Sequence, residues 1–172
     1  MKVAGILRKS PSKKVEVSIK DQKGGIRTKV DQDLGKDIKI DWIIDICEGD
    51  NEEGRIELLK WFKKIVSYDK AYCLNVDRFS RGYLGLKWFH EFFLPNNCQL
   101  HFVNEVQCMY DEEGKLIEEP YLFFFMLCAF ANYWLIKIRK GRTKGIERVK
   151  ADPKLRAEKY KGGKKGRTWK CK

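Results

Sequence analysis

The feature that most constrains the fold of this chain is an alternation of short apolar runs with segments of helical spacing. Four runs have the length and composition of buried β-strands, and they cover residues 3–7, 38–44, 71–76 and 100–103. The segments between them favour helices, and they cover residues 17–34, 55–66 and 83–94. Because strands and helices alternate, the sequence predicts an α/β fold with a mostly parallel central sheet flanked by helices on both faces.

Charge is distributed unevenly along the 172 residues. Residues 137–172 hold 16 Lys and Arg against 3 Asp and Glu, whereas residues 1–136 hold 20 against 21. The net charge of +12 therefore comes from the C-terminal part alone. A basic segment of this kind is typical of proteins that bind a polyanion, most often nucleic acid, and a solvated or membrane-binding tail is the alternative.

Cysteine and histidine usage argues against a metal site. The 6 cysteines form no C-x-x-C pair, and the only histidines are His90 and His101. We therefore expect no metal and no cofactor. The cysteines are expected to be buried free thiols in a reducing compartment.

Residues 121–136 form an apolar run of 16 residues without a charge. The run is shorter than the roughly 20 residues that a bilayer span needs, and it contains Asn132. A helix that is apolar all round is either buried or shared with another chain. We therefore expect a long helix that packs on the sheet and continues as a contact in a dimer or tetramer, with a membrane span as the alternative.

Polar side chains follow each of the first three predicted strands. The first strand is followed by Arg8 and Ser10, and the next two are followed by Asp45, Glu48, Arg55, Asp77, Arg78 and Arg81. Because the carboxyl ends of parallel strands lie side by side, we expect these residues to converge. Arginine forks match phosphate oxygens, and clustered arginines stabilise the charge of a phosphodiester during transfer. A serine beside them indicates phosphoryl transfer without a metal.

Two other hydrolytic chemistries find little support in the sequence. The chain has no G-x-S-x-G elbow for a Ser-His-Asp hydrolase, and neither histidine occupies a recognisable position. It also has no P-loop, so nucleotide hydrolysis is not indicated.

The order of these motifs resembles the catalytic domain of the serine recombinases, the resolvase and invertase superfamily that includes phage and transposon integrases. The resemblance covers residues 2–150 and rests on R-x-S, S-x-x-D-Q and D-R-x-x-R, which place Arg8, Ser10, Ser18, Asp21, Gln22, Asp77, Arg78 and Arg81. Weaker matches are Asp45 with Glu48 and Gly49 before Arg55, residues 102–105, residues 129–131 and Gly145. The long spacing from Ser10 to Gln22 is similar to that of the integrase branch.

The resemblance implies a site-specific recombinase that cuts and rejoins double-stranded DNA. Ser10 would attack a phosphodiester and form a 5′-phosphoserine link, and Arg8, Arg78 and Arg81 would hold the phosphate. Arg55 would add positive charge, and Asp77 would orient the arginines or move a proton. Gln22 and Asp45 would support the site. The covalent link would conserve the energy of the phosphodiester, so neither ATP nor a metal would be needed.

The resemblance also implies partners and a location. The expected partners are double-stranded DNA and a homodimer that assembles into a tetramer for strand exchange by rotation, with no membrane and no small-molecule substrate. The basic residues expected to bind DNA are Arg139, Arg142, Lys144, Arg148, Lys161, Lys164, Lys165 and Arg167. The protein is expected in the cytoplasm, associated with the nucleoid and encoded by a bacterium, a phage or a mobile element.

Several positions depart from the family pattern. Ile6 stands where the family usually has a Tyr, two residues before the first Arg. In the long helix, Trp134 and Leu135 stand where the family has Glu and Arg, and Gly141 stands where it has a later Arg. The alternative function is therefore a catalytically weak or idle DNA-binding relative that associates with an active recombinase. The expected domains are a resolvase-like catalytic domain over 1–120, a long oligomerisation and DNA-contacting helix over 121–150, and a basic flexible tail over 151–172.

Overall fold

The computed structural model describes residues 1–11, 18–47, 52–80, 82–106 and 108–154. The chain divides into two compact units, Met1–Tyr133 and Trp134–Lys172. The first unit contains the sheet and the candidate site. The second contains the C-terminal part of one long helix, so the predicted three-domain division stays a prediction.

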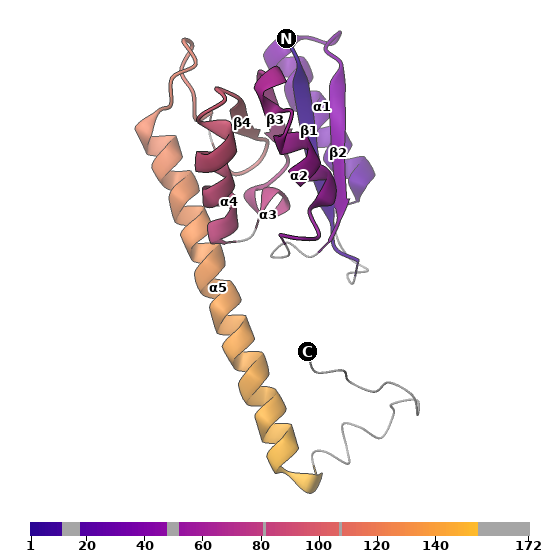
Figure 1. Cartoon of the computed structure of the whole chain (residues 1–172), viewed down its shortest axis with the longest axis vertical. Coiled ribbons are helices and arrows are strands. Elements are labelled where there is room, and N and C mark those ends of the chain that lie inside the picture. The colour runs from indigo at the N-terminus through magenta and orange to yellow at the C-terminus, as the bar shows by residue number, and fades with distance from the viewer. Residues whose placement is uncertain (12–17, 48–51, 81, 107, 155–172) are drawn as a thin grey trace. The chain divides into compact units, whose positions relative to one another are not determined.

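The sheet has four parallel strands in the order β2-β1-β3-β4 (Figure 1). The strands are β1 (Val3–Lys9), β2 (Ile40–Ile46), β3 (Lys70–Cys73) and β4 (Gln99–Phe102). β1 lies between two neighbours and is buried from Val3 to Arg8, which is why its sequence is an almost continuous apolar run. The predicted parallel sheet is confirmed.

Helices cover both faces of this sheet, because successive strand residues point to opposite sides. On one face, Val3, Leu7 and Tyr72 pack against Ile26 and Val30 of α1 (Ile19–Leu34). On the other face, alternate strand residues pack against α2 (Ile56–Phe62), α4 (Tyr83–Trp88), the π-helix η2 (Phe89–Phe93) and the start of α5 (Glu118–Ala151). The flanking helices predicted from the sequence are thereby confirmed.

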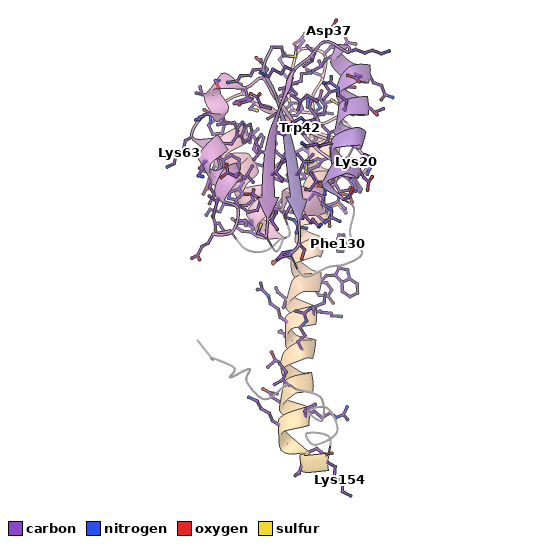
Figure 2. All side chains as sticks on the ribbon, turned by 90° about the vertical axis from the view of Figure 1, so that its right-hand side faces the viewer. Lys20, Asp37, Trp42, Lys63, Phe130 and Lys154 are labelled. Atoms are coloured by element: carbon purple, nitrogen blue, oxygen red, sulfur yellow. The ribbon has the colours of Figure 1, made fainter. Side chains whose placement is uncertain are left out.

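The strands of the sheet separate the two helical layers. Lys20 of α1 and Lys63 beyond α2 lie on opposite sides of the sheet, with Trp42 of β2 between them (Figure 2). The indole of Trp42 covers Gly5 so closely that a Cβ at Gly5 would lie 2.5 Å from the ring. A glycine is therefore required at this position of β1, because the Trp42 ring occupies the space that a side chain at Gly5 would need.

The third strand ends earlier than the sequence predicts. We expected a strand over 71–76, but β3 ends at Cys73 and Val76 begins the one-turn helix α3 (Val76–Phe79). The cause is a distant carboxylate: Val76 N and Asn75 Nδ2 donate to Glu105 at 2.7 and 3.0 Å. This contact satisfies one backbone donor at the start of α3, so the helix begins at Val76, directly before the D-R-x-x-R motif.

Two predicted helices also end in other geometries. The segment 55–66 is α-helical only as far as Phe62, and a 3₁₀ turn η1 (Ile65–Ser67) follows. The segment 83–94 changes from α4 to the π-helix η2 at Phe89. Both segments still bury one apolar face, since Leu58, Trp61 and Phe62 lie in the same core as Trp88, Phe89 and Phe93.

Helix α5 contains the uncharged run and confirms the prediction of a long C-terminal helix. Within the first unit, Phe124 is buried and its ring lies 5.4 Å from the rings of Phe89 and Phe102. Most of its other large apolar residues are exposed: Leu122, Phe123, Phe125, Met126 and Phe130. An 18-residue window has a mean hydropathy of 1.6 and is 12% buried, so α5 is long and apolar enough to cross a membrane by length and composition.

Cysteine placement corrects one expectation. Cys47, Cys73, Cys98 and Cys128 are buried free thiols, and burial raises the pKa of Cys73 to about 12. Cys108 is exposed, so the expectation of burial is wrong there, because this residue lies in the loop after β4. Cys171 lies outside the described residues.

His101 on β4 gives a prediction about the pH dependence of stability. The imidazole is 6% exposed and stacks on Tyr72, and burial, with help from the Lys70 ammonium, lowers its pKa from 6.5 to about 4. The unfolded chain therefore binds more protons at this histidine than the folded chain between these pH values. We expect the free energy of unfolding to fall by about 2 kcal/mol between pH 7 and pH 5 from this residue alone.

Urea titrations at the two pH values measure this loss. His101→Phe is expected to remove it, whereas His90→Gln, at an exposed histidine that contacts Tyr121, is expected to leave it unchanged. A His101→Phe variant that keeps the full pH dependence would contradict the assignment.

Candidate active site

The guanidinium of Arg8 joins two elements at the carboxyl end of β1. Arg8 is fully buried, and its Nη1 donates to the Cys47 carbonyl after β2 at 3.0 Å. Its Nη2 donates to the Asp77 carbonyl in α3 at 3.2 Å. The fork of arginine reaches both carbonyls at once, which the single ammonium of lysine does not. Arg8 therefore fixes α3 beside the end of β2.

Gln22 of α1 holds the backbone of Arg8 through two hydrogen bonds. Arg8 N donates to Gln22 Oε1 at 3.2 Å, and Gln22 Nε2 donates to the Arg8 carbonyl at 3.0 Å. The first turn of α1 is fixed by a capping box, in which Asp21 N donates to Ser18 Oγ at 3.1 Å and Ser18 N donates to Asp21 Oδ2 at 3.3 Å. The S-x-x-D-Q motif is thus a helix cap followed by the side chain that positions Arg8.

A buried ion pair between Asp45 and Arg55 joins the end of β2 to the start of α2. Arg55 Nε donates to Asp45 Oδ2 at 3.1 Å, and the two side chains are 1% and 2% exposed. Asp45 also accepts from Glu57 N at 2.9 Å and Leu58 N at 3.3 Å in the first turn of α2. The same carboxylate at the end of β2 therefore caps α2 and also holds the guanidinium of Arg55 in place.

Arg55 extends from this pair to the backbone of α3. Its Nη1 donates to the carbonyls of Arg78 and Phe79 at 3.1 and 2.7 Å, and its guanidinium lies 5.7 Å from the ring centroid of Trp88. Its Nη2 is buried and has no hydrogen-bond partner among the described residues. A buried donor of this kind is suited to an anionic ligand.

The motif residues Asp77 and Arg78 lie on α3, whose backbone accepts hydrogen bonds from both Arg8 and Arg55. Arg78 is 9% exposed, and its Nε lies 3.7 Å from Asp77 Oδ1. Ser10 follows β1 two residues after Arg8 and is 1% exposed. Arg8, Asp45, Arg55 and their hydrogen bonds therefore join β1, β2 and α2 to the helix that carries Asp77 and Arg78.

The structure brings together most of the predicted site, although the roles of these residues stay predictions. Hydrogen bonds and ion pairs connect Arg8, Gln22, Asp45, Arg55, Asp77 and Arg78. Arg81, Glu48 and Gly49 lie outside the described residues, as do Lys161, Lys164, Lys165 and Arg167. In the second unit, α5 exposes the remaining predicted DNA contacts, which are Arg139, Arg142, Lys144 and Arg148.

Glu105 is a residue of the site whose importance the sequence pattern left undefined. It belongs to the 102–105 match, but its role is visible only in the fold, where its carboxylate caps α3. Its position three residues after β4 is the one signal for this role, since an acidic residue there lies at the same edge of the sheet as the other strand ends. No group of three potential metal ligands occurs among the residues that the structure describes.

The family model for the N-terminal domain of resolvases matches residues 3–155, and the chain belongs to this family of serine recombinases. The crystal structure of the N-terminal catalytic domain of TP901-1 integrase is 20% identical and has a TM-score of 0.54. That match covers 81% of this chain and 99% of the integrase domain. At this identity the likeness concerns the fold, and it agrees with the α/β architecture described above.

Other solved structures match with lower TM-scores. The first open reading frame of transposon ISC1904 from Sulfolobus solfataricus P2 is 19% identical over 94% of this chain and 100% of that one, with a TM-score of 0.47. The C-terminal catalytic domain of ISC1926 TnpA, an IS607-like serine recombinase, is 20% identical over 60% and 70%, also with a TM-score of 0.47. A search of curated sequences found no match.

Proposed function

We propose that this chain is a site-specific DNA recombinase that cuts double-stranded DNA through a covalent bond to Ser10. The observation that carries the proposal is the network in which Arg8 and Arg55 both bind the backbone of α3, the helix of Asp77 and Arg78. Arg8 and Arg55 thus both contact the helix that carries Arg78, and Ser10 follows Arg8 by two residues at the end of β1. This arrangement suits a phosphodiester better than a neutral substrate.

The chemistry is a transfer of the phosphoryl group from one oxygen to another. Ser10 Oγ forms a bond to phosphorus, the bond from phosphorus to the 3′ oxygen breaks, and the product is a 5′-phosphoserine link with a free 3′ hydroxyl. The serine proton leaves as the bond forms, and the departing oxygen takes up a proton. Positive charge from Arg8, Arg55 and Arg78 stabilises the extra negative charge of the transition state.

Ser10 is 1% exposed, so DNA has to uncover its hydroxyl before attack. Arg8 is held by Gln22, Cys47 and Asp77, and Arg55 by Asp45 and α3, so neither guanidinium needs to be ordered by the substrate. Fixed cations of this kind lower the cost of reorganisation during the reaction. Asp77 in turn holds Arg78 through their ion pair.

Helix α5 supplies the contacts with partners in this proposal. In the second unit its exposed Arg139, Arg142, Lys144 and Arg148 bind DNA phosphates. In the first unit its exposed apolar residues, among them Phe123, Phe125 and Phe130, are covered by a second copy of the chain. Dimers of this kind assemble into a tetramer when two DNA sites are cut and exchanged.

A covalent adduct tests the proposal directly. Random-sequence duplexes are enriched by repeated rounds of binding to the full chain, and the bound pool is then incubated with the protein. We expect an adduct that resists detergent, and we expect Ser10→Ala to abolish it without loss of DNA binding. Ser67→Ala, at an exposed serine remote from the site, is expected to leave the yield unchanged. Bound DNA without any adduct from the unaltered chain would reject the proposal.

A further inference from the structure

The glycine after the D-R-x-x-R motif lies directly against α5. Gly82 has a φ of +79°, and a Cβ on it would lie 3.2 Å from Asn132 Cβ, 3.2 Å from Asn132 Oδ1 and 3.3 Å from Asn132 Cα. Two separate restrictions therefore require glycine: the left-handed backbone and the lack of space. The Gly82 backbone cannot move toward α5, because Asn132 already fills the space beside it.

A second contact of the same kind lies one helical turn away. A Cβ on Gly85 of α4 would lie 3.2 Å from Ser80 Cβ and 3.5 Å from Cys128 Sγ. Cys128 and Asn132 are four residues apart and share one face of α5. This face therefore packs against Gly82 and Gly85, and Figure 1 shows α5 passing beside α4 in the first unit.

The residues just before Gly82 that the structure describes are held by the site itself. Arg55 Nη1 binds the Arg78 and Phe79 carbonyls, and Ser80 N donates to the Val76 carbonyl at 2.9 Å. Arg55 thus holds the backbone at Arg78 and Phe79, and α5 lies against Gly82 and Gly85 a few residues later. Ser80 also lies against Gly85, whose other near neighbour on α5 is Cys128, so we expect a change in the packing of α5 to move the backbone that carries Arg78.

We propose that Asn132 is a positioning residue for the catalytic arginine segment and acts on it through Gly82. The proposal rests on the proposed function and extends it, because it makes the first part of α5 a wall of the active site as well as a surface for subunit contact. Asn132 is exposed, whereas Cys128 is buried in the core. Asn132 can therefore be replaced without removing core packing, and its effect on the site can be measured separately from stability.

The test compares a side chain at position 132 that is too large for the space beside Gly82 with one that fits it. Asn132→Phe brings a larger side chain toward Gly82, and Asn132→Leu keeps about the original size without the amide. With saturating protein on the enriched duplexes, we expect Asn132→Phe to slow adduct formation by at least about tenfold. We expect Asn132→Leu to stay within about threefold of the unaltered chain. The protein concentration that gives half the maximal rate is expected to be the same for all three.

Sedimentation and thermal unfolding provide the controls for this comparison. Both variants are expected to keep the assembly state of the unaltered chain and to remain folded at the temperature of the assay. The inference is overturned if Asn132→Phe reacts at the normal rate, if both variants are equally slow, or if the slow rate accompanies a changed assembly state. An unaltered chain that binds DNA and forms no adduct rejects the proposed function as well, so the two failures are distinguishable.

Discussion

Replacing Asp45 by alanine is expected to lower the free energy of unfolding by about 3–5 kcal/mol. The change leaves the guanidinium of Arg55, which is 1% exposed, without its carboxylate. It also removes the acceptor for Glu57 N and Leu58 N at the start of α2. Urea unfolding monitored by tryptophan fluorescence measures the loss.

An exposed ion pair is the matched control for this prediction. Glu113 and Lys115 lie 2.6 Å apart, but their side chains are 71% and 75% exposed. Water and salt screen such a pair, so Glu113→Ala is expected to change the free energy of unfolding by less than about 1 kcal/mol. Equal losses for Asp45→Ala and Glu113→Ala would show that the buried pair has no special role in stability.

Replacing Arg8 by alanine is expected to slow adduct formation by at least about a hundredfold. The variant loses a fixed positive charge at the end of β1, two residues before Ser10, and it leaves the carbonyls of Cys47 and Asp77 without the donor that joins them. A smaller loss of stability, about 1–3 kcal/mol, is expected from these buried acceptors. Adduct yield against time, measured at saturating protein, separates the rate effect from DNA affinity.

Two further variants decide what Arg8 contributes. Arg8→Lys keeps the charge but loses the fork, so a rate between those of alanine and arginine is expected. Lys9→Ala removes a neighbouring exposed cation and is expected to change the maximal rate only by a few-fold. If Arg8→Ala and Lys9→Ala slow the reaction equally, nonspecific charge explains the effect, and the proposed role of the Arg8 fork is wrong.

The course of the main chain was largely predictable from local pattern. The runs at 3–7, 38–44 and 100–103 overlap β1, β2 and β4, and the run in β1 is the most continuous because β1 is buried on both faces. The boundary of β3 was not predictable locally. Val76 looks like the last residue of a strand, but a carboxylate 29 residues later caps its amide and begins a helix there.

In the candidate site, too, the residues were predictable from the sequence but their contacts were not. Its members were recognisable because Arg8, Asp45 and Asp77 follow strand-like runs, and parallel strands bring such ends together. Their contacts were not recognisable. Sequence spacing does not reveal that Arg55 is buried against Asp45 or that Gln22 binds the backbone of Arg8, because these bonds join residues 10 and 14 positions apart on different elements.

The sequence by itself determined the class of fold, the resemblance to the serine recombinases and most of the residues that hydrogen bonds and ion pairs connect at the edge of the sheet. The fold class follows from local periodicity, whereas the family resemblance and the site residues follow from the order of short motifs along the chain. The tertiary structure alone decided how the arginines are held, that Glu105 turns the chain into α3, and that Gly82 lies against Asn132 of α5. Burial and close packing decide these features, and both depend on residues that are distant in the sequence.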